Sequence, residues 1–367
     1  MLQASSRLTA APQASTAALC PARHSSTRRP FSSCPAPPQQ QRHAAAAAPA
    51  PAHRRQLLGA PLLLPFAAGR GRAVVMAAAA GSHDLLIVGP GVLGSFMGTL
   101  WKQQHPDATV TAQTNTESNH ERLRKMGLQP ITRDAAPAGK QYPYVLFAAP
   151  PSGSDDYPAA VAAATRQWDG SGSFVFTSSM SVCATEDGSE VSEACPLVAK
   201  GKAPGTDKLL GAEAATLEAG GNVLRLVGLY HASRGPHTFF IKQGEVARWG
   251  GYTVNMLHYE DAARIAMAVL AGDGSEGGKG WRGQVFVGTD GHPLTFQEMV
   301  DACFASGLFS GSVKFTGAPD TTPGGKGKVV NNTATRAKLG GWSPKYTSFR
   351  QFFMDGGKDY YNSSGLF

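Results

Sequence analysis

Residues 84–94 constrain the fold of this chain more than any other stretch. The segment reads Asp-Leu-Leu-Ile-Val-Gly-Pro-Gly-Val-Leu-Gly, an apolar run that passes directly into a Gly-x-Gly-x-x-Gly pattern. An apolar run of this length bounded by polar residues predicts a buried β-strand. The residues that follow, 95–104, are compatible with a helix. A strand, a glycine-rich turn and a helix, in this order, are the setting in which the pattern binds a dinucleotide.

Each glycine of the pattern has a separate expected role. Gly89 permits the tight turn, Gly91 lets the backbone approach a pyrophosphate, and Gly94 lets the helix pack closely on the strand. The helix would also direct free N–H groups and its positive dipole end at the phosphates. We therefore expect NAD or NADP to bind here, the alternative being a glycine-rich turn without a ligand. The residues expected to contact it are Gly89, Gly91, Val92, Leu93 and Gly94.

Strand and helix signals alternate after the glycine pattern. Strands are expected at 108–113, 144–149, 172–177 and 222–226, and helices at 121–126, 156–168 and 208–219. This alternation predicts an α/β fold with a Rossmann-type, doubly wound parallel sheet. Ligands bind such sheets at the carboxyl ends of the strands. The further residues expected to contact the cofactor at these ends are Thr114, Asn115, Ala148, Ala149, Pro150 and Ser178.

The pattern loosens after about residue 230. Glycine-rich loops at 272–280 and 319–328 separate shorter elements. Helices are predicted at 261–270 and at 295–306, the second with Thr295 and Glu298 as a capping box. We therefore expect a Rossmann domain over 81–230 that binds NAD or NADP. A smaller C-terminal lobe over 231–367, interleaved with the sheet, is expected to set substrate specificity.

The first 80 residues have the composition of a targeting segment. They contain nine arginines and no aspartate or glutamate, and they are rich in alanine, serine, proline and glutamine. Basic, serine-rich and acid-free segments are typical of organelle transit peptides. The abundance of alanine and proline favours targeting to a chloroplast, and the alternative is a disordered tail without a targeting function. We expect 1–80 to be a disordered transit peptide to the chloroplast.

A second targeting signal can be read inside this segment. Arg54-Arg55 precedes a short apolar stretch, 61–68, and a run of alanines at 77–80. This order resembles a twin-arginine signal to the thylakoid lumen, whereas the simpler interpretation is a stromal cleavage region. We favour the stroma. The apolar stretch is too short to span a bilayer, and no later segment predicts a transmembrane helix.

The basic character of the chain belongs to this leader. The whole chain has a formal net charge of +8, but 81–367 hold 25 basic and 26 acidic side chains, a net charge of −1. A near-neutral protein lacks the overall positive charge typical of nucleic-acid-binding domains, so we expect no nucleic-acid partner. No metal site is expected either, since the histidines show no ligand spacing and Cys183, Cys195 and Cys303 form no Cys-x-x-Cys pair.

Several blocks in register resemble the extended short-chain dehydrogenase/reductase superfamily, which includes the sugar-nucleotide epimerases and dehydratases. Besides the glycine pattern they are Phe-Val-Phe-Thr-Ser-Ser-Met-Ser-Val at 174–182, Leu-Leu-Gly-Ala-Glu at 209–213, Val-Leu-Arg-Leu-Val-Gly-Leu-Tyr at 223–230 and Val-Asn-Met-Leu-His-Tyr-Glu-Asp at 254–261. The blocks cover most of 84–355 and are most similar to the atypical, epimerase-like subgroup. The resemblance implies a nicotinamide dinucleotide cofactor and a small-molecule substrate.

The resemblance also implies a catalytic serine, tyrosine and lysine, with Tyr-x-x-x-Lys on the helix after the serine strand. There the tyrosine moves a proton while the nicotinamide moves a hydride. Ser179 occupies the place of the serine, but 183–212 contain no tyrosine. Depending on the alignment, Pro204 or Gly205 stands in its place. The usual proton-transfer residue is therefore missing.

Three functions stay open for a site without this tyrosine. In the first, the chain binds nucleotide as a structural or regulatory ligand without catalysis. In the second, it is an oxidoreductase or epimerase that uses another acid. In the third, it acts in plastid assembly or with RNA, as plastid members of this superfamily do. The candidate catalytic residues are Ser179, Tyr230, His231 and His258. Each has a structural alternative: Ser179 as a strand-end hydrogen-bond partner, Tyr230 as a packed side chain and His258 as a helix cap.

The choice between NAD and NADP depends on the end of the second strand. NAD sites place Asp or Glu there to bind the ribose hydroxyls. This chain has Gln-Thr-Asn at 113–115, and Glu117 is expected to lie too far beyond the strand to reach the ribose. Arg122, Arg124 and Lys125 follow shortly after. The pattern favours NADP over NAD, unless the three basic residues only form a solvated helix face.

Overall fold

The computed structural model describes residues 82–272, 280–321 and 325–359. All of them belong to the second of two units into which the chain divides, Val74–Phe367. The predictions for 1–80, the transit peptide and the twin-arginine signal, lie outside the described residues. None of the helices in the described ranges combines the length and the apolar composition needed to cross a membrane.

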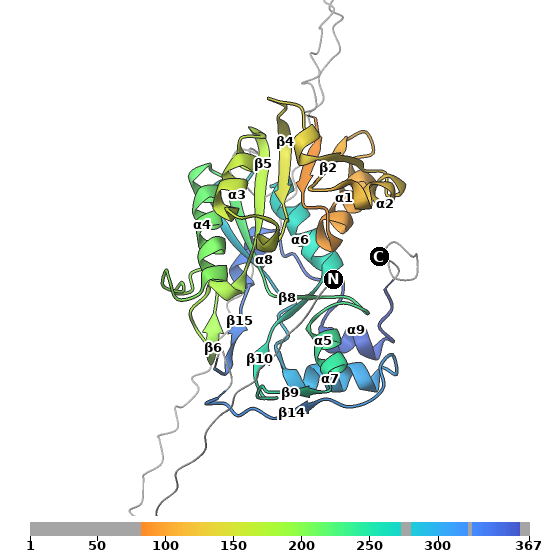
Figure 1. Ribbon diagram of the computed structural model, residues 1–367, viewed down its shortest axis with the longest axis vertical. Helices are drawn as coiled ribbons and strands as arrows, with labels where there is room; N and C mark the ends of the chain where they lie inside the picture. Colours follow the sequence, from red (N-terminus) through yellow and green to blue (C-terminus); the bar gives the residue numbers. More distant parts are fainter. Residues whose placement is uncertain (1–81, 273–279, 322–324, 360–367) are drawn as a thin grey trace, which may run out of the picture. The chain divides into compact units, whose positions relative to one another are not determined.

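A seven-stranded sheet, here called the main sheet, forms the centre of the described chain (Figure 1). Its strand order is β12-β7-β5-β4-β1-β2-β3, and every neighbouring pair is parallel. The strands are β1 (Leu85–Val88), β2 (Val110–Thr114), β3 (Gln129–Thr132), β4 (Tyr142–Phe147), β5 (Trp168–Ser179), β7 (Asn222–Leu226) and β12 (Val285–Gly288). The chain turns from one half of the sheet to the other between β1 and β4, the point where ligands bind such sheets. The predicted Rossmann-type α/β fold is confirmed.

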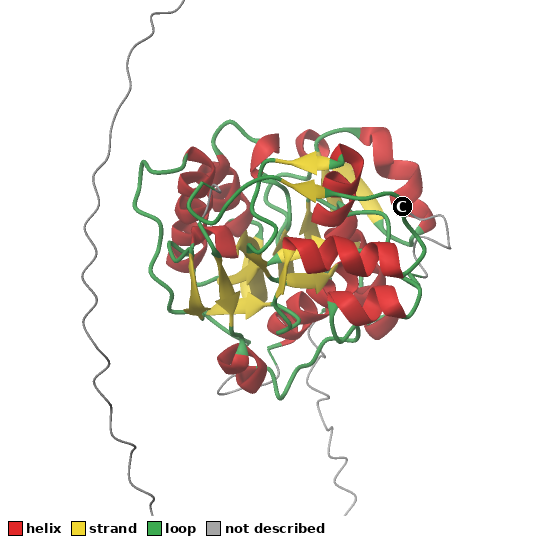
Figure 2. Cartoon of the chain, turned by 90° about the horizontal axis from the view of Figure 1, so that it is seen from below, coloured by secondary structure: helices red, strands yellow, loops and turns green. Residues whose placement is uncertain are grey.

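Helices cover both faces of the main sheet (Figures 1 and 2). On one face lie α1 (Val92–Gln104), α2 (His120–Lys125) and α6 (Tyr259–Ala271), and on the other α3 (Tyr157–Thr165) and α4 (Pro204–Glu218). Leu85 and Ile87 of β1 pack on the side of α1, α2 and α6, and Leu86 packs on the side of α3 and α4. Because both faces are buried, the strand must be apolar throughout, which is why its sequence shows no alternation.

A second region, here called the lobe, packs around an aromatic core of its own. The core includes Tyr230, Phe240, Phe296, Phe349 and Phe353. Its elements are α5 (Pro236–Gln243), α7 (Phe296–Ala305), α9 (Phe349–Met354), β9 (Glu245–Val246), β13 (Leu294–Thr295) and β14 (Lys314–Phe315). The predicted capping box is present at the start of α7, where the Thr295 hydroxyl accepts from the Glu298 amide and the Glu298 carboxylate accepts from the Thr295 amide.

Short strands link the two regions. A four-stranded sheet has the order β13-β10-β15-β6, and β8 pairs with β11 in a parallel, two-stranded sheet (Figure 1). The bounds are β6 (Asp187–Val191), β8 (Gly228–Tyr230), β10 (Thr253–Val254), β11 (Met256–His258) and β15 (Gly327–Val330), with α8 (Thr333–Lys338) beside β12.

The chain passes between the main sheet and the lobe more than once. β7 leads into β8 and α5 of the lobe, α6 and β12 return to the main sheet, and α7 and α9 lie in the lobe again. Residues after 231 therefore contribute to both regions.

Some predicted elements differ in extent from the observed ones. The helix expected over 156–168 ends at Thr165, and Trp168 begins β5, where its indole N–H donates to Pro143 O at 3.1 Å. The helix expected from 208 begins at Pro204, whose fixed φ suits the first helical turn. The strands β8 to β11 have two or three residues each, too few for a periodic pattern to predict them.

Candidate functional site

The glycine turn begins at Gly89, directly after β1. Gly89 has φ +82°, a conformation that L side chains rarely adopt. A Cβ at this position would lie 2.4 Å from the Cα of Ala149, which follows β4. Only glycine fits this tight turn between two neighbouring strands, as the sequence predicts.

Gly94 brings α1 close to β1. A Cβ on Gly94 would lie 2.9 Å from Ile87 Cγ2 and 3.0 Å from the carbonyl oxygen of Gly89. Any larger residue would therefore push the N-terminus of the helix away from the strand. The close packing expected of this glycine is present.

Gly91 differs from both, because a Cβ there would meet no atom within 4 Å. Gly91 is the N-cap of α1, and no side chain caps the helix there. The first N–H groups of a helix have no partner within it and carry the positive end of its dipole. Open space beside an uncapped, positively polarised helix end fits a pyrophosphate.

A cavity of about 580 Å³ adjoins this turn at the carboxyl ends of β1, β2 and β4. Of the residues predicted to contact the cofactor, it is lined by Gly89, Thr114, Asn115, Ala149 and Pro150. The residues Gly91, Val92, Leu93, Gly94, Ala148 and Ser178 do not line it. The structure thus joins the turn to the ends of the neighbouring strands and places the rest of the glycine pattern beside the cavity.

The cavity carries positive charge. Arg133, Lys140 and Arg166 are among its lining residues, and none of the described residues that line it has a carboxylate. Asp155 and Asp156 belong to an adjoining pocket that shares Arg133 with this one. The sequence analysis missed these three basic residues, because they follow β3, precede β4 and end α3 without a common motif.

The end of β2 offers hydrogen-bonding groups without a carboxylate. The Thr114 hydroxyl contacts His120 Nε2 at 2.8 Å and Ile131 O at 3.2 Å, and Asn115 is exposed at the cavity. On α2, Arg122 donates to Ser95 Oγ of α1 at 3.3 Å, and burial lowers the pKa of its guanidinium. Lys125 instead pairs with Glu121 at 2.8 Å on the exposed side of the helix.

The two adjacent serines at the end of β5 point to different surroundings. Ser178 is buried and donates to Glu213 Oε1 at 2.6 Å, and Glu213 in turn pairs with Arg225 at 2.7 Å. Ser178 therefore braces a buried ion pair under α4. Ser179 accepts from the Ser181 amide at 3.1 Å and caps the short 3-10 helix Met180–Val182.

Ser179 also lines a second pocket, of about 270 Å³, with Glu186, Tyr252 and Lys328. Burial, together with the negative charge of Glu186, raises the pKa of Tyr252 to about 12. No sequence signal points to these three residues, because they come from separate parts of the chain that only the fold brings together.

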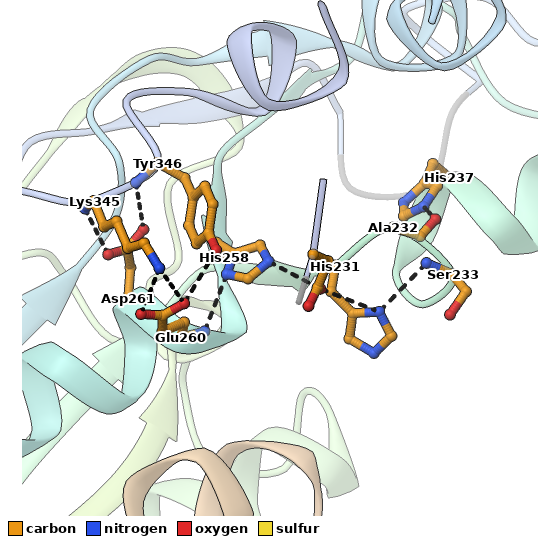
Figure 3. Close-up of polar contacts among 10 residues, drawn as sticks. His231, Ala232, Ser233, His237, His258, Glu260, Asp261, Lys345 and Tyr346 are labelled. Atoms are coloured by element: carbon orange, nitrogen blue, oxygen red, sulfur yellow. Dashed lines mark hydrogen bonds and ion pairs between the residues drawn. The ribbon is translucent and has the colours of Figure 1, made fainter. Parts of the chain in front are cut away.

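None of the other three candidate catalytic residues lines that pocket. Figure 3 shows two of them, His231 and His258, with their polar contacts. Tyr230 of β8 stands opposite His258 of β11, and both are buried. His258 Nδ1 accepts from the Glu260 amide at 3.1 Å, so His258 is the N-cap of α6. Its Nε2 lies 3.3 Å from Asp359 Oδ2, and His231 Nδ1 lies 3.9 Å from the same oxygen.

Figure 3 shows how this cluster is fixed to the start of α6. The backbone amides of Lys345 and Tyr346 donate to Asp261 at 2.7 and 3.0 Å. The Lys345 ammonium and the Tyr346 hydroxyl both contact Glu260, at 2.9 and 3.0 Å. These bonds tie the chain before α9 to α6.

Burial favours the neutral forms of Tyr230, His231 and His237. It raises the pKa of Tyr230 well above the usual value, and the Tyr230 ring packs against Phe349 and Phe352. Burial also lowers the pKa of His231 and brings that of His237 to about 4. The geometry gives Tyr230 and His258 packing and capping contacts.

The place of the missing tyrosine lies on the first turn of α4. Pro204 is the first residue of that helix, and Gly205 is the second. Lys208, four residues after Pro204, donates to Ser154 O at 3.3 Å. Neither residue in the place of the tyrosine carries a side chain that can move a proton.

Solved structures share the architecture, whereas neither the protein-family models nor the curated proteins match the sequence. A conserved protein of unknown function from Silicibacter pomeroyi is 23% identical, with a TM-score of 0.60 over 74% of this chain and 97% of its own. UDP-glucuronic acid 4-epimerase from Bacillus cereus, in complex with NAD, is 16% identical, with a TM-score of 0.59 over 77% and 100%.

A third similar structure is dTDP-glucose 4,6-dehydratase from Bacillus anthracis in complex with NAD. It is 14% identical, with a TM-score of 0.57 over 77% of this chain and 99% of its own. At such identities the likeness concerns the fold. The described chain has the fold of the NAD-dependent epimerases and dehydratases, that of the extended short-chain dehydrogenases/reductases.

Proposed function

We propose that this chain belongs to the extended short-chain dehydrogenase/reductase superfamily and binds NADP, in preference to NAD, at the glycine turn and the adjoining cavity. The observation that carries the proposal is the open space at Gly91 beside the uncapped N-terminus of α1. Similar structures in complex with NAD support the binding of a nicotinamide dinucleotide.

In this proposal the glycine turn and α1 hold the pyrophosphate, and the cavity takes the adenosine half. When bound, the cofactor supplies a hydride donor or acceptor at its nicotinamide. The protein binds and orients it. Tyr157 lines the cavity, and its hydroxyl is held by a 2.7 Å hydrogen bond to Ala149 O, which keeps that wall in place.

The preference for NADP rests on charge. NADP carries an additional phosphate on the adenosine ribose, and a carboxylate at the end of β2 would repel it. This chain has Asn115 there, and Arg133 at the end of the neighbouring strand β3. A cation beside this position favours the extra phosphate.

The reaction we propose is an oxidoreductase or epimerase-type conversion of a small molecule without the usual Tyr-x-x-x-Lys pair. Ser179 remains at the end of β5 and lines the pocket at that edge of the main sheet. The alternative role in regulation or with RNA draws no support from the similar structures.

We also propose that the protein acts in the chloroplast stroma. The support is the acid-free, arginine- and serine-containing composition of 1–80. A fluorescent protein fused to these residues should accumulate in chloroplasts, and a cytosolic signal would contradict the proposal.

Calorimetric titration of the full chain with NADP and with NAD tests the binding site. NADP should bind more tightly, and Gly91→Ala should weaken binding at least about tenfold while leaving the melting temperature of the free protein unchanged. The loss is expected because the added methyl group occupies the space at the helix end, where it contacts no protein atom.

Gly205→Ala is the matched control. It also adds a methyl group in open space near the start of a helix, but Gly205 does not line the cavity, so NADP binding should stay as in the wild type. If neither dinucleotide binds or raises the melting temperature of the wild-type protein, the proposed site is wrong.

A further inference from the structure

The pocket at Ser179 is built by parts of the chain that are distant in sequence. Ser179 ends β5, Gly228 begins β8, Tyr252 precedes β10, and Lys328 lies on β15. Glu186 precedes β6, the neighbour of β15. At about 270 Å³ the pocket is slightly smaller than usual ligand sites, so it suits a small molecule.

Three of its side chains form one hydrogen-bonded group. Lys328 Nζ lies 2.8 Å from Glu186 Oε1, and the Tyr252 hydroxyl donates to Glu186 Oε2 at 3.0 Å. Lys328 also donates to the carbonyl oxygens of Cys183 at 2.8 Å and Met180 at 3.4 Å. An ammonium has three N–H groups, so these contacts use all of them.

This arrangement removes the only positive charge of the pocket from reach of a ligand. Lys328 is the single lysine or arginine among the described residues that line the pocket, and its side chain is 8% exposed. Glu186 neutralises it, while the Glu186 side chain itself is 35% exposed. A ligand that enters the pocket therefore meets a carboxylate and no available cation, which disfavours anionic groups.

The same residues retain capacity for neutral hydrogen-bonding groups. A carboxylate has about four acceptor positions, of which the contacts of Glu186 with Lys328 and Tyr252 use two. Ser179 Oγ accepts from the Ser181 amide and retains its O–H as a donor. Leu226, Val254 and Val330 supply apolar surface in the same pocket.

We propose that this pocket binds a small, neutral molecule that carries a hydroxyl group, that Glu186 accepts the hydrogen bond of this hydroxyl, and that the Glu186–Lys328 pair excludes phosphates and carboxylates. The proposal rests on the proposed function, since the bound alcohol is taken to be the substrate class of the same protein. Glu186 is thereby a specificity-determining residue.

The test uses the full chain and a matched pair of probes, D-glucose and D-glucose 6-phosphate, with glycerol and cyclohexanol as smaller neutral probes. Binding is followed by saturation-transfer NMR. In the wild type at least one neutral probe should bind, and glucose 6-phosphate should bind at least about tenfold more weakly than glucose or not at all.

Glu186→Gln should abolish or reverse this order. The amide keeps the shape but leaves the Lys328 charge without its partner, so glucose 6-phosphate should gain at least about tenfold in affinity relative to glucose. Tyr252→Phe removes one hydrogen bond to Glu186 and no charge, so anions should stay excluded. Glu190→Gln is the control, because Glu190 is exposed on β6 and does not line the pocket.

Three results would overturn the proposal: no binding of any neutral probe, tighter binding of glucose 6-phosphate than of glucose by the wild type, or an unchanged order in Glu186→Gln. NADP titration of the same samples separates the two proposals. Loss of NADP binding in every sample contradicts the proposed function, whereas NADP binding with the wrong probe order contradicts only the inference about Glu186. NADP binding by Glu186→Gln also shows that the variant is folded.

Discussion

One layer of the main sheet and the core of the lobe are stabilised by different kinds of side chain. The layer under α1, α2 and α6 consists chiefly of aliphatic residues such as Leu85, Ile87, Leu224 and Ile265, whereas the opposite layer also holds aromatic residues such as Phe174 and Phe176. The core of the lobe is dominated by aromatic rings that contact one another edge to face, for example Phe240 on Phe296 at 4.9 Å between centroids. Aliphatic residues suit the layer between a parallel sheet and its helices, whereas aromatic residues fill a small core with few side chains.

The two regions also differ in how they bury ionisable groups. Under α4, Glu213 and Arg225 form an ion pair at 2.7 Å, and Ser178 donates a hydrogen bond to Glu213. In the lobe, burial instead favours the neutral forms, as at His237, and the Tyr230 hydroxyl is buried without a hydrogen-bond partner among the described residues. We therefore expect the stability of the main sheet to depend on both partners of its buried ion pair, and the stability of the lobe to depend on pH.

The largest effect is expected from Glu213→Gln. The substitution leaves the Arg225 guanidinium buried, with a side chain 5% exposed and no opposite charge at 2.7 Å. Breaking a buried pair in this way costs about 3–5 kcal/mol of unfolding free energy. Urea unfolding should show this loss, and Glu218→Gln, at the exposed end of the same helix, should not. Equal stability of the two variants would mean that the buried pair is not a source of stability.

A pH-dependent effect is expected at Asp290, where the main sheet meets the lobe. Burial raises the pKa of this carboxyl from 3.8 to about 7, although the amides of His292 and Phe349 donate to it. The folded protein therefore binds this proton more tightly than the unfolded chain. The stability contributed by the protonated form is fully present below about pH 4 and is lost as the pH rises to about 7.

Asp290→Asn removes this titration. Relative to the variant, the wild type should lose up to about 1.4 kcal/mol of stability per pH unit between about pH 5 and pH 7, with no further change above. Urea unfolding of both proteins across this range measures the difference. Asp301→Asn on α7, an exposed position, should show no such slope. If the stability of the wild type and of Asp290→Asn depends on pH in the same way, the raised pKa of Asp290 is contradicted.

The smallest effect is expected at the cavity beside the glycine turn. Arg133→Ala should lower the affinity for NADP about threefold to tenfold, and that for NAD less, because an exposed cation contributes modestly to binding a phosphate. Calorimetric titration with both dinucleotides gives the ratio. Arg124→Ala, which removes an exposed arginine that does not line the cavity, should leave the ratio unchanged. An unchanged ratio in Arg133→Ala would remove the support for NADP.

The sequence predicts the main sheet well because its signals are local. Leu85–Val88 is a continuous apolar run, and the turn at Gly89 follows without a gap. Asn222–Leu226 is found with the bounds that the sequence predicts. In each case the residues that decide the structure are neighbours in the chain.

The pocket at Ser179 and the position of Ser178 could not be predicted in the same way. Glu186, Tyr252 and Lys328 meet only because β6, β10 and β15 lie in one small sheet. Whether Ser178 or Ser179 faces a pocket depends on the partner that each finds, and Glu213 is far away in sequence. Such contacts depend on long-range packing, for which a single sequence has no local pattern.

The position of β12 has a consequence for how this protein is made. β7 pairs on one side with β5 and on the other with β12, yet β12 follows β7 in sequence only after β8, α5, β9, β10, β11 and α6. While the chain emerges from the ribosome, β7 is thus an unprotected sheet edge until residues 285–288 arrive, and such edges recruit other strands. A chain that stalls between β7 and β12 should therefore be prone to aggregation, and a chaperone that covers this edge should raise the yield of native protein.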